Sequence, residues 1–208
     1  MKASGCERFL CALAFLAAFG TLAGCAAEKE VAVFRYHEGV TPSDYYPLEM
    51  GCAWSYNVTV HAPDGQKQIL STTKVVGGDG ADVWLRTGQN DFTYRVDEQG
   101  ILKVQANYYL LRGPIRPDAS WQLSLQGMDG TLKITDVHAT VETPAGTFQE
   151  CVVTEEVVPG LDNKVLTTFA PGVGVVKIEE FGMAGGQQIP LREAELMAFE
   201  TAESKKSE

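Results

Sequence analysis

The chain has 208 residues, of which 45% are hydrophobic, and a formal net charge of -10. This length and apolar content fit one folded domain with short appendages and exclude disorder of the whole chain. The acidic balance argues against a nucleic-acid-binding protein, because no basic run is longer than Lys205–Lys206 and phosphate recognition needs clustered lysine and arginine. Anionic lipid repels the same charge, so membrane attachment would need something other than electrostatic attraction.

The first 24 residues have the pattern of an export signal. Lys2 and Arg8 precede an uncharged apolar run over residues 9–24, which is the order found in secretory signal peptides. The run is shorter than the about 20 residues that span a bilayer. The mixed charges of residues 28–30 follow it, where a stop-transfer signal would have a basic cluster. We therefore expect this segment to direct export and to be removed.

Residues 22–25, Leu-Ala-Gly-Cys, resemble the bacterial lipobox. The resemblance implies that Cys25 receives a diacylglyceryl group, that the chain is cut just before it, and that an acyl chain such as palmitate modifies the new amino terminus. Two or three acyl chains anchor a protein stably, whereas one is marginal. Ala26 stands where an aspartate would signal retention, which by analogy with enteric sorting favours the outer membrane. The alternative is an ordinary signal peptide cut elsewhere, with Cys25 free.

Residues 25–44 have no clear period and predict a lipidated tether. Apolar and polar residues alternate from residue 45 to residue 200, as Trp54 and Tyr56 do with their neighbours, and this predicts half-buried strands. Turns that contain glycine, such as Pro63-Asp64-Gly65, separate the strands. The expected strands span residues 53–62, 69–76, 81–88, 92–96, 101–106, 120–126, 130–143, 149–158, 164–170, 175–181 and 191–200.

About ten short strands at this spacing predict a mainly β domain over residues 45–200, built as a single antiparallel meander. Such a sheet hides its edges by closing into a barrel or curling into a half-barrel. The alternation within residues 130–143 changes face once, which indicates a bulge. Residues 191–200 also fit a helix, but we assign them to a last strand. We expect residues 201–208 to be a disordered tail.

Two cysteines remain once the leader is removed and Cys25 is lipidated, namely Cys52 and Cys151. An oxidising compartment permits a disulfide between them, which would close a loop of about 100 residues and contribute up to about 4.7 kcal/mol in the chain-entropy model. The alternative is two buried free thiols that act as small hydrophobic residues. No CxxC pair is present, so we expect no redox role.

No catalytic or metal-binding motif is found in the sequence. It lacks a GxSxG elbow, an HExxH helix, a phosphate loop and a dinucleotide fingerprint. The histidines lie far apart in sequence, at His37, His61 and His138. Asp79 and Asp82 lack the spacing of a calcium loop and fit a hairpin turn, and Glu155 and Glu156 fit solvated strand positions. We therefore expect no enzymatic activity, cofactor or metal.

Three stretches together resemble one family of bacterial envelope lipoproteins. They are YYPLEMGCAWSY at 45–56, TPAGTFQECVV at 143–153 and FAPGVGVVKIEE at 169–180. The set is similar to the TapB-like lipoproteins over about residues 42–200, and it implies a curved sheet of the LolA/LolB type around an apolar cavity. Gly51 and Trp54 would start the first strand. Cys52 stands where the family resemblance leads us to expect a polar residue such as asparagine, which favours the disulfide.

The sequence leaves three hypotheses for function. The first is a non-catalytic membrane-anchored lipoprotein whose domain faces the periplasm or the cell surface and binds a lipid, a peptide or an envelope protein on the concave side of its sheet. The second is a structural or assembly role, which an interior without a cavity would favour. The third is a hydrolase, which would need two carboxyl groups that converge in a cleft.

Overall fold

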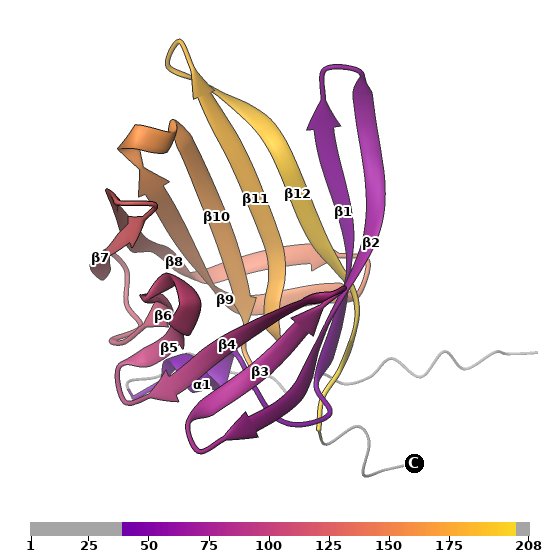
Figure 1. Ribbon diagram of the computed structural model, residues 1–208, viewed down its shortest axis with the longest axis vertical. Helices are drawn as coiled ribbons and strands as arrows, with labels where there is room; N and C mark the ends of the chain where they lie inside the picture. Colours follow the sequence, from indigo (N-terminus) through magenta and orange to yellow (C-terminus); the bar gives the residue numbers. More distant parts are fainter. Residues whose placement is uncertain (1–38, 203–208) are drawn as a thin grey trace, which may run out of the picture. The chain divides into compact units, whose positions relative to one another are not determined.

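The structure is a computed structural model and describes residues 39–202. These residues form a single antiparallel sheet of twelve strands (Figure 1). The predicted mainly β meander is confirmed, with twelve strands rather than about ten. One strand without a sequence signal is β6 (Tyr108–Arg112), whose apolar residues follow one another without alternation.

The strands and short helices follow one another through the described chain. They are α1 (Pro42–Tyr45), β1 (Ala53–Ala62), β2 (Gly65–Asp79), β3 (Asp82–Thr87), β4 (Asn90–Asp97), β5 (Gly100–Lys103), the 3-10 helix η1 (Val104–Ala106), β6 (Tyr108–Arg112), β7 (Ser120–Leu125), β8 (Met128–Thr143), β9 (Gly146–Val158), the 3-10 helix η2 (Pro159–Leu161), β10 (Asn163–Ala170), β11 (Gly174–Ala184) and β12 (Gln187–Glu200). Residues 191–200 thus belong to a last strand, as predicted.

The order of strands across the sheet is β6-β5-β4-β3-β2-β1-β12-β11-β10-β9-β8-β7. Every neighbouring pair is consecutive in sequence except β1 and β12, which pair in the middle of the sheet. The two edges are therefore β6 and β7. A hydrogen bond of 2.7 Å from Trp121 Nε1 to the carbonyl oxygen of Tyr109 links these two edges, so the sheet is a nearly closed barrel.

Alternation along β1 decides which side chains face the inside of the curved sheet. Trp54 and Tyr56 point inward and are buried. The indole nitrogen of Trp54 donates to the carbonyl oxygen of Val173 over 2.5 Å, and the Tyr56 hydroxyl donates to that of Val175 over 2.9 Å. Buried polar tips need such partners. These bonds join β1 to the β10–β11 turn and the start of β11, and fix the inner wall there.

The short helix α1 covers one end of the sheet (Figure 1). Pro42 stands at its first turn, and the Thr41 backbone amide donates to the Asp44 carboxylate over 2.7 Å, which caps the helix start. Tyr45 is fully buried. Residues 40–44, assigned to the tether from sequence, include the buried Val40 and Pro42. The domain core therefore already includes part of this segment.

The β8–β9 hairpin contacts β12, which is not its neighbour in the sheet. The predicted bulge in residues 130–143 is confirmed, because the register between β8 and β9 shifts at three places between Ile134 and Val141. The resulting bend brings the hairpin turn to β12, where the Ala145 amide donates to the Leu196 carbonyl over 3.0 Å. The Phe148 and Phe199 rings meet at 6.2 Å. This end of the barrel is thus closed by packed side chains.

Candidate functional site

The site residues predicted from sequence have different outcomes. Cys25 and His37 lie outside the described residues, as do residues 203–208 of the tail. Cys52 and Cys151 are both buried free thiols, which is the alternative to a disulfide considered above. Burial, with smaller contributions from Glu150 and Asp136, raises the pKa of the Cys151 thiol to about 12. A thiol that stays protonated is a poor nucleophile, so Cys151 acts as a small core residue.

The histidines and aspartates singled out in the sequence do not converge. His61 is bonded to Gln66 at 3.2 Å, and His138 contacts Glu150 at 2.7 Å on another part of the sheet. Across residues 39–202, no group of three or more histidine, cysteine or acidic residues could hold a metal ion. Asp79 pairs with Asp82 at the β2–β3 turn, which is the predicted hairpin.

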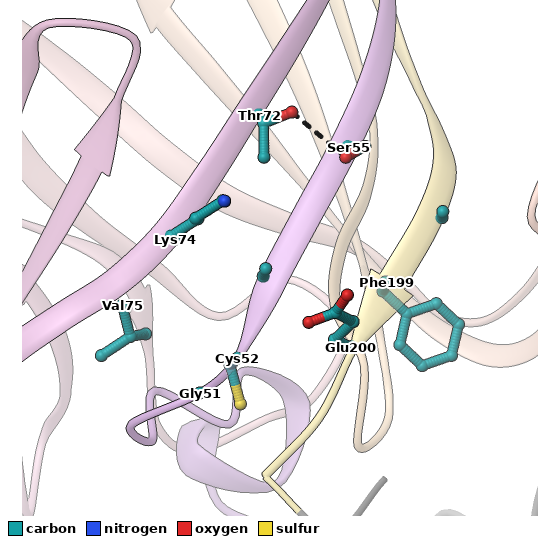
Figure 2. A pocket seen from close by; sticks show the side chains of 10 residues that line it. Gly51, Cys52, Ser55, Thr72, Lys74, Val75, Phe199 and Glu200 are labelled. Atoms are coloured by element: carbon teal, nitrogen blue, oxygen red, sulfur yellow. Dashed lines mark hydrogen bonds between the residues drawn. The ribbon is translucent and has the colours of Figure 1, made fainter. Parts of the chain in front are cut away.

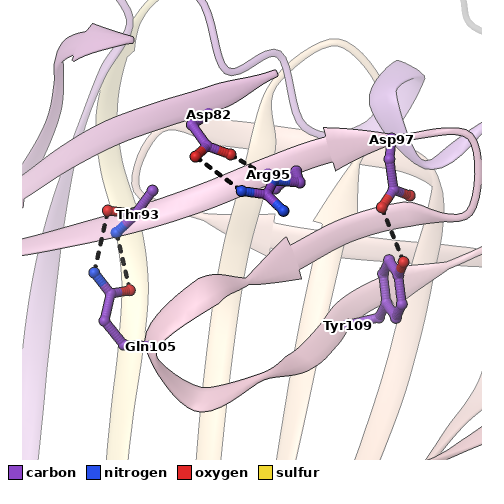
Figure 3. Close-up of polar contacts among 6 residues, drawn as sticks. All are labelled: Asp82, Thr93, Arg95, Asp97, Gln105 and Tyr109. Carbon is purple, nitrogen blue, oxygen red and sulfur yellow. Dashed lines mark hydrogen bonds and ion pairs between the residues drawn. The ribbon is translucent and has the colours of Figure 1, made fainter. Parts of the chain in front are cut away.

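The outer face of β3 to β6 is braced by side-chain pairs (Figure 3). Arg95 binds Asp82 with two hydrogen bonds of 2.6 and 3.0 Å, and the Tyr109 hydroxyl donates to Asp97 over 2.9 Å. Gln105 bonds to both the backbone and the hydroxyl of Thr93. Because these pairs lie at the surface, each contributes little to stability. Their role is to hold the short hairpins β3–β4 and β5–β6 in line as one wall of the barrel.

A cavity of about 460 Å³ lies inside the curved sheet, within the size range of small-molecule sites. One wall comes from β1, β10, β11 and β12, and includes Val58, Ile178 and Ala194. The facing wall comes from β3 to β6 and includes Leu85 and Leu110. The cavity therefore has aliphatic side chains on both of its walls.

Four tyrosines add hydroxyl groups to the cavity lining: Tyr46, Tyr56, Tyr94 and Tyr108. Burial raises the pKa of all four, that of Tyr94 to about 12. They are therefore neutral hydroxyls at physiological pH. Tyr46 also packs edge-on against Trp54, with ring centroids 5.2 Å apart. The tyrosines give the cavity hydrogen-bonding groups without charge.

Charged side chains form a band at one level of the inner face. Strand pairing places Glu156, Val165, Glu180 and Arg192 side by side across β9 to β12. Arg192 contacts Glu180 at 2.8 Å. Glu156 accepts a hydrogen bond from Tyr108 on the facing wall, and burial raises its pKa against the smaller opposing effects of Lys103 and Tyr108. The cavity thus combines apolar walls with a localised polar band.

Lys103, at the end of β5, belongs to the same band. Its side chain is half-buried, lines the cavity, and places its ammonium 5.8 Å from the centre of the Phe92 ring. Within residues 39–202, Lys103 forms no ion pair with a carboxylate. A cation held in an apolar cavity against an aromatic face is stabilised by the ring and remains able to bind an anion.

A second, smaller hollow of about 290 Å³ lies beside the start of β1, the middle of β2 and the end of β12 (Figure 2). It is lined by Lys74, Ser55 and Glu200 among others. Ser55 alternates with the inward-facing Trp54 and Tyr56, so this hollow lies on the outer face. Its lining brings together no cluster of titratable groups comparable to the band inside the barrel.

The polar band is the part of the site that sequence reasoning missed. Glu156 was expected at a solvated position together with Glu155, but it points inward while Glu155 pairs with Lys164 at 3.4 Å on the other face. The available signal was alternation with Thr154 and Val158, which are buried on the same side. Lys103 had no comparable signal, because the facing wall is defined only by the folded sheet.

Comparisons with known proteins leave the family open. No protein-family model matches the chain, and no curated protein matches it. Among solved structures, the chain is similar to a Bacteroides fragilis protein described as exported, with a YmcC-like fold, at 13% identity and a TM-score of 0.47, over 76% of this chain and 99% of that one. A Parabacteroides distasonis protein described as a lipoprotein aligns at 12% identity and a TM-score of 0.41, over 75% and 98%. The resemblance to TapB-like lipoproteins therefore stays a prediction.

None of the helices within residues 39–202 is both long and apolar enough to cross a membrane.

Proposed function

We propose that this protein is a lipid-anchored lipoprotein of the bacterial envelope, held in the outer membrane through Cys25, whose curved sheet binds an apolar or amphipathic ligand and performs no catalysis. The observation that carries the binding role is the cavity of about 460 Å³ on the inner face. A sheet filled by its own side chains, as a purely structural role requires, would leave no such space. The anchor rests on the leader and the lipobox-like residues 22–25.

The apolar surface continues beyond the cavity, which supports entry of a ligand from that side. Ile69 pairs with Val58 and therefore lies on the same inner face, but it is 55% exposed. Covering such a side chain with another apolar group is favourable by about 25 cal/mol for each Å² of apolar surface removed from water. A ligand chain or a partner's apolar side chain would provide that cover.

A hydrolase is less well supported, although two carboxyl groups lie in the band. Glu180 is paired with Arg192, and Glu156 is bonded to Tyr108. A hydrolytic pair needs one group free to donate and one free to accept a proton at the same bond. Both carboxyl groups have protein partners instead, so we favour binding.

The test uses the chain that starts at residue 26, which keeps every contact described above. Its binding of N-phenyl-1-naphthylamine, a neutral apolar fluorophore, is measured by titration. Val58→Trp should fill the cavity and weaken binding by about tenfold or more, the equivalent of about 1.4 kcal/mol. Asn57→Trp, on the opposite face of the same strand, is the control and should bind as the unchanged chain does. Equal binding by both variants, or no binding by the unchanged chain, would refute the cavity as a ligand site.

A further inference from the structure

The polar band inside the barrel has two carboxyl groups and two cations, but of these four only Arg192 and Glu180 form an ion pair. Arg192 is neutralised by Glu180, and the Glu156 carboxyl is engaged by Tyr108. Lys103 lies near enough to Glu156 to affect its pKa but forms no ion pair with it. The Lys103 ammonium instead lies over the Phe92 ring. The inner face therefore has one cation whose charge no carboxylate of residues 39–202 takes up by direct contact.

The position of Lys103 defines how a ligand would lie. Lys103 pairs with Tyr108 across β5 and β6 and with Tyr94 across β4 and β5, and both tyrosines also line the cavity. Val58, Ile178 and Ala194 form the apolar wall on the other side. A molecule that fills this space would have an anionic or strongly accepting group at one end and an apolar chain at the other.

We propose that the cavity binds a single-chain amphiphile with an anionic head group, a carboxylate or a phosphate, with the head at Lys103 and the chain along Val58, Ile178 and Ala194. This proposal rests on the proposed function and names the ligand class for the same cavity. A cationic ligand fits less well, because its head would lie beside the Lys103 ammonium in the same lining. A neutral chain would leave the Lys103 ammonium without a counter-charge, and burying an unpaired charge is costly.

The test compares four ligands of equal chain length on the chain that starts at residue 26. Dodecanoate, dodecyl phosphate, dodecanol and dodecylamine are each titrated against bound N-phenyl-1-naphthylamine, below the micellar concentration or the solubility limit of each ligand. Dodecanoate or dodecyl phosphate should bind about tenfold more tightly than dodecanol, because a charge-assisted hydrogen bond is about twice as strong as a neutral one. The stronger of the two identifies the head group.

Variants at Lys103 separate this inference from the proposed function. Lys103→Met should remove the preference for the anion over dodecanol, and Lys103→Arg should restore the preference. Lys74→Met, which deletes an equal charge on the outer face, should change neither. Equal affinity for dodecanoate, dodecyl phosphate and dodecanol, or a preference for dodecylamine, would overturn the anionic head group while the binding role stands. Failure of every ligand and of the fluorophore would instead refute the proposed function.

Discussion

The indole nitrogen of Trp121 on β7 donates to the backbone carbonyl of Tyr109 on β6 over 2.7 Å, and so links the two edges of the sheet. Its ring is buried as well. A side chain therefore replaces the backbone ladder that a fully closed barrel would have between these strands. The stability of the whole barrel should depend on this one contact more than on a typical surface residue.

Replacing Trp121 by phenylalanine keeps an aromatic ring and removes the donor. Leaving a partly buried carbonyl without its partner should lower the free energy of unfolding by about 1 kcal/mol, measured by urea denaturation. Trp84→Phe, at a tryptophan that is 44% exposed, is the control and should have little effect. Hydrogen exchange of the β6 amides should accelerate in Trp121→Phe alone. A stability loss equal to that of Trp84→Phe would show that the link between the edges is unimportant.

Gly174 follows the β10–β11 turn and has φ of +111°, and a Cβ there would lie 2.8 Å from Tyr46 Cδ2. Gly174→Ala should therefore combine backbone strain with a clash in the core and destabilise by about 2–4 kcal/mol. Gly172→Ala is a matched control, because φ is +68° but open space surrounds the new methyl group. It should cost about 1 kcal/mol. Thermal unfolding of both variants measures the difference, and equal losses would mean that Tyr46 moves away freely.

Asp82 and Asp91 provide a paired test of pH dependence. Hydrogen bonding to Arg95 holds the pKa of Asp82 below its ordinary value, and Arg86 does the same for Asp91. A carboxyl group whose pKa is lower in the folded state adds stability above its unfolded pKa, and this stability is lost as the pH falls through the folded pKa. Unfolding free energy should therefore decrease in the acidic range, below the ordinary aspartate pKa.

Carboxyl NMR titration assigns that effect to the individual pairs. Arg95→Met should raise the pKa of Asp82 toward its ordinary value of 3.8 and leave Asp91 unchanged, since its partner is still present. Arg86→Met should do the reverse. If either variant shifted both groups equally, long-range charge rather than the direct pair would control these carboxyls.

Cys52 and Cys151 should both be detected as free thiols by a thiol-specific reagent. With Cys151 fully buried and its pKa raised by burial, a water-soluble disulfide reagent at pH 8 should react very slowly with the native chain that starts at residue 26. In denaturant without reductant, two thiols should react at once. Cys52→Ala should reduce that number to one. Finding no reactive thiol in the denatured chain, and two only after reduction, would establish the disulfide instead.

The sequence predicted the sheet well because its signal is local. Alternation around Trp54 and Tyr56 identifies both the strand and its buried face, since side chains of a strand point to opposite sides in turn. The same signal failed at β6, where Tyr108 to Leu111 are all apolar. It also failed for the functional residues. Glu156, Lys103 and Arg192 come from β9, β5 and β12, and their meeting depends on closure of the barrel, which no local pattern encodes.

The pairing of β1 with β12 has a consequence for how the chain folds. Trp54 lies opposite Phe199, so the first strand obtains its second neighbour only when nearly the last residue of the domain is available. Contacts between residues this far apart in sequence slow folding, because a long loop must close before the contact forms. A chain that ends before β12 therefore lacks the second partner of its first strand, and the barrel can be completed only after that last strand is present.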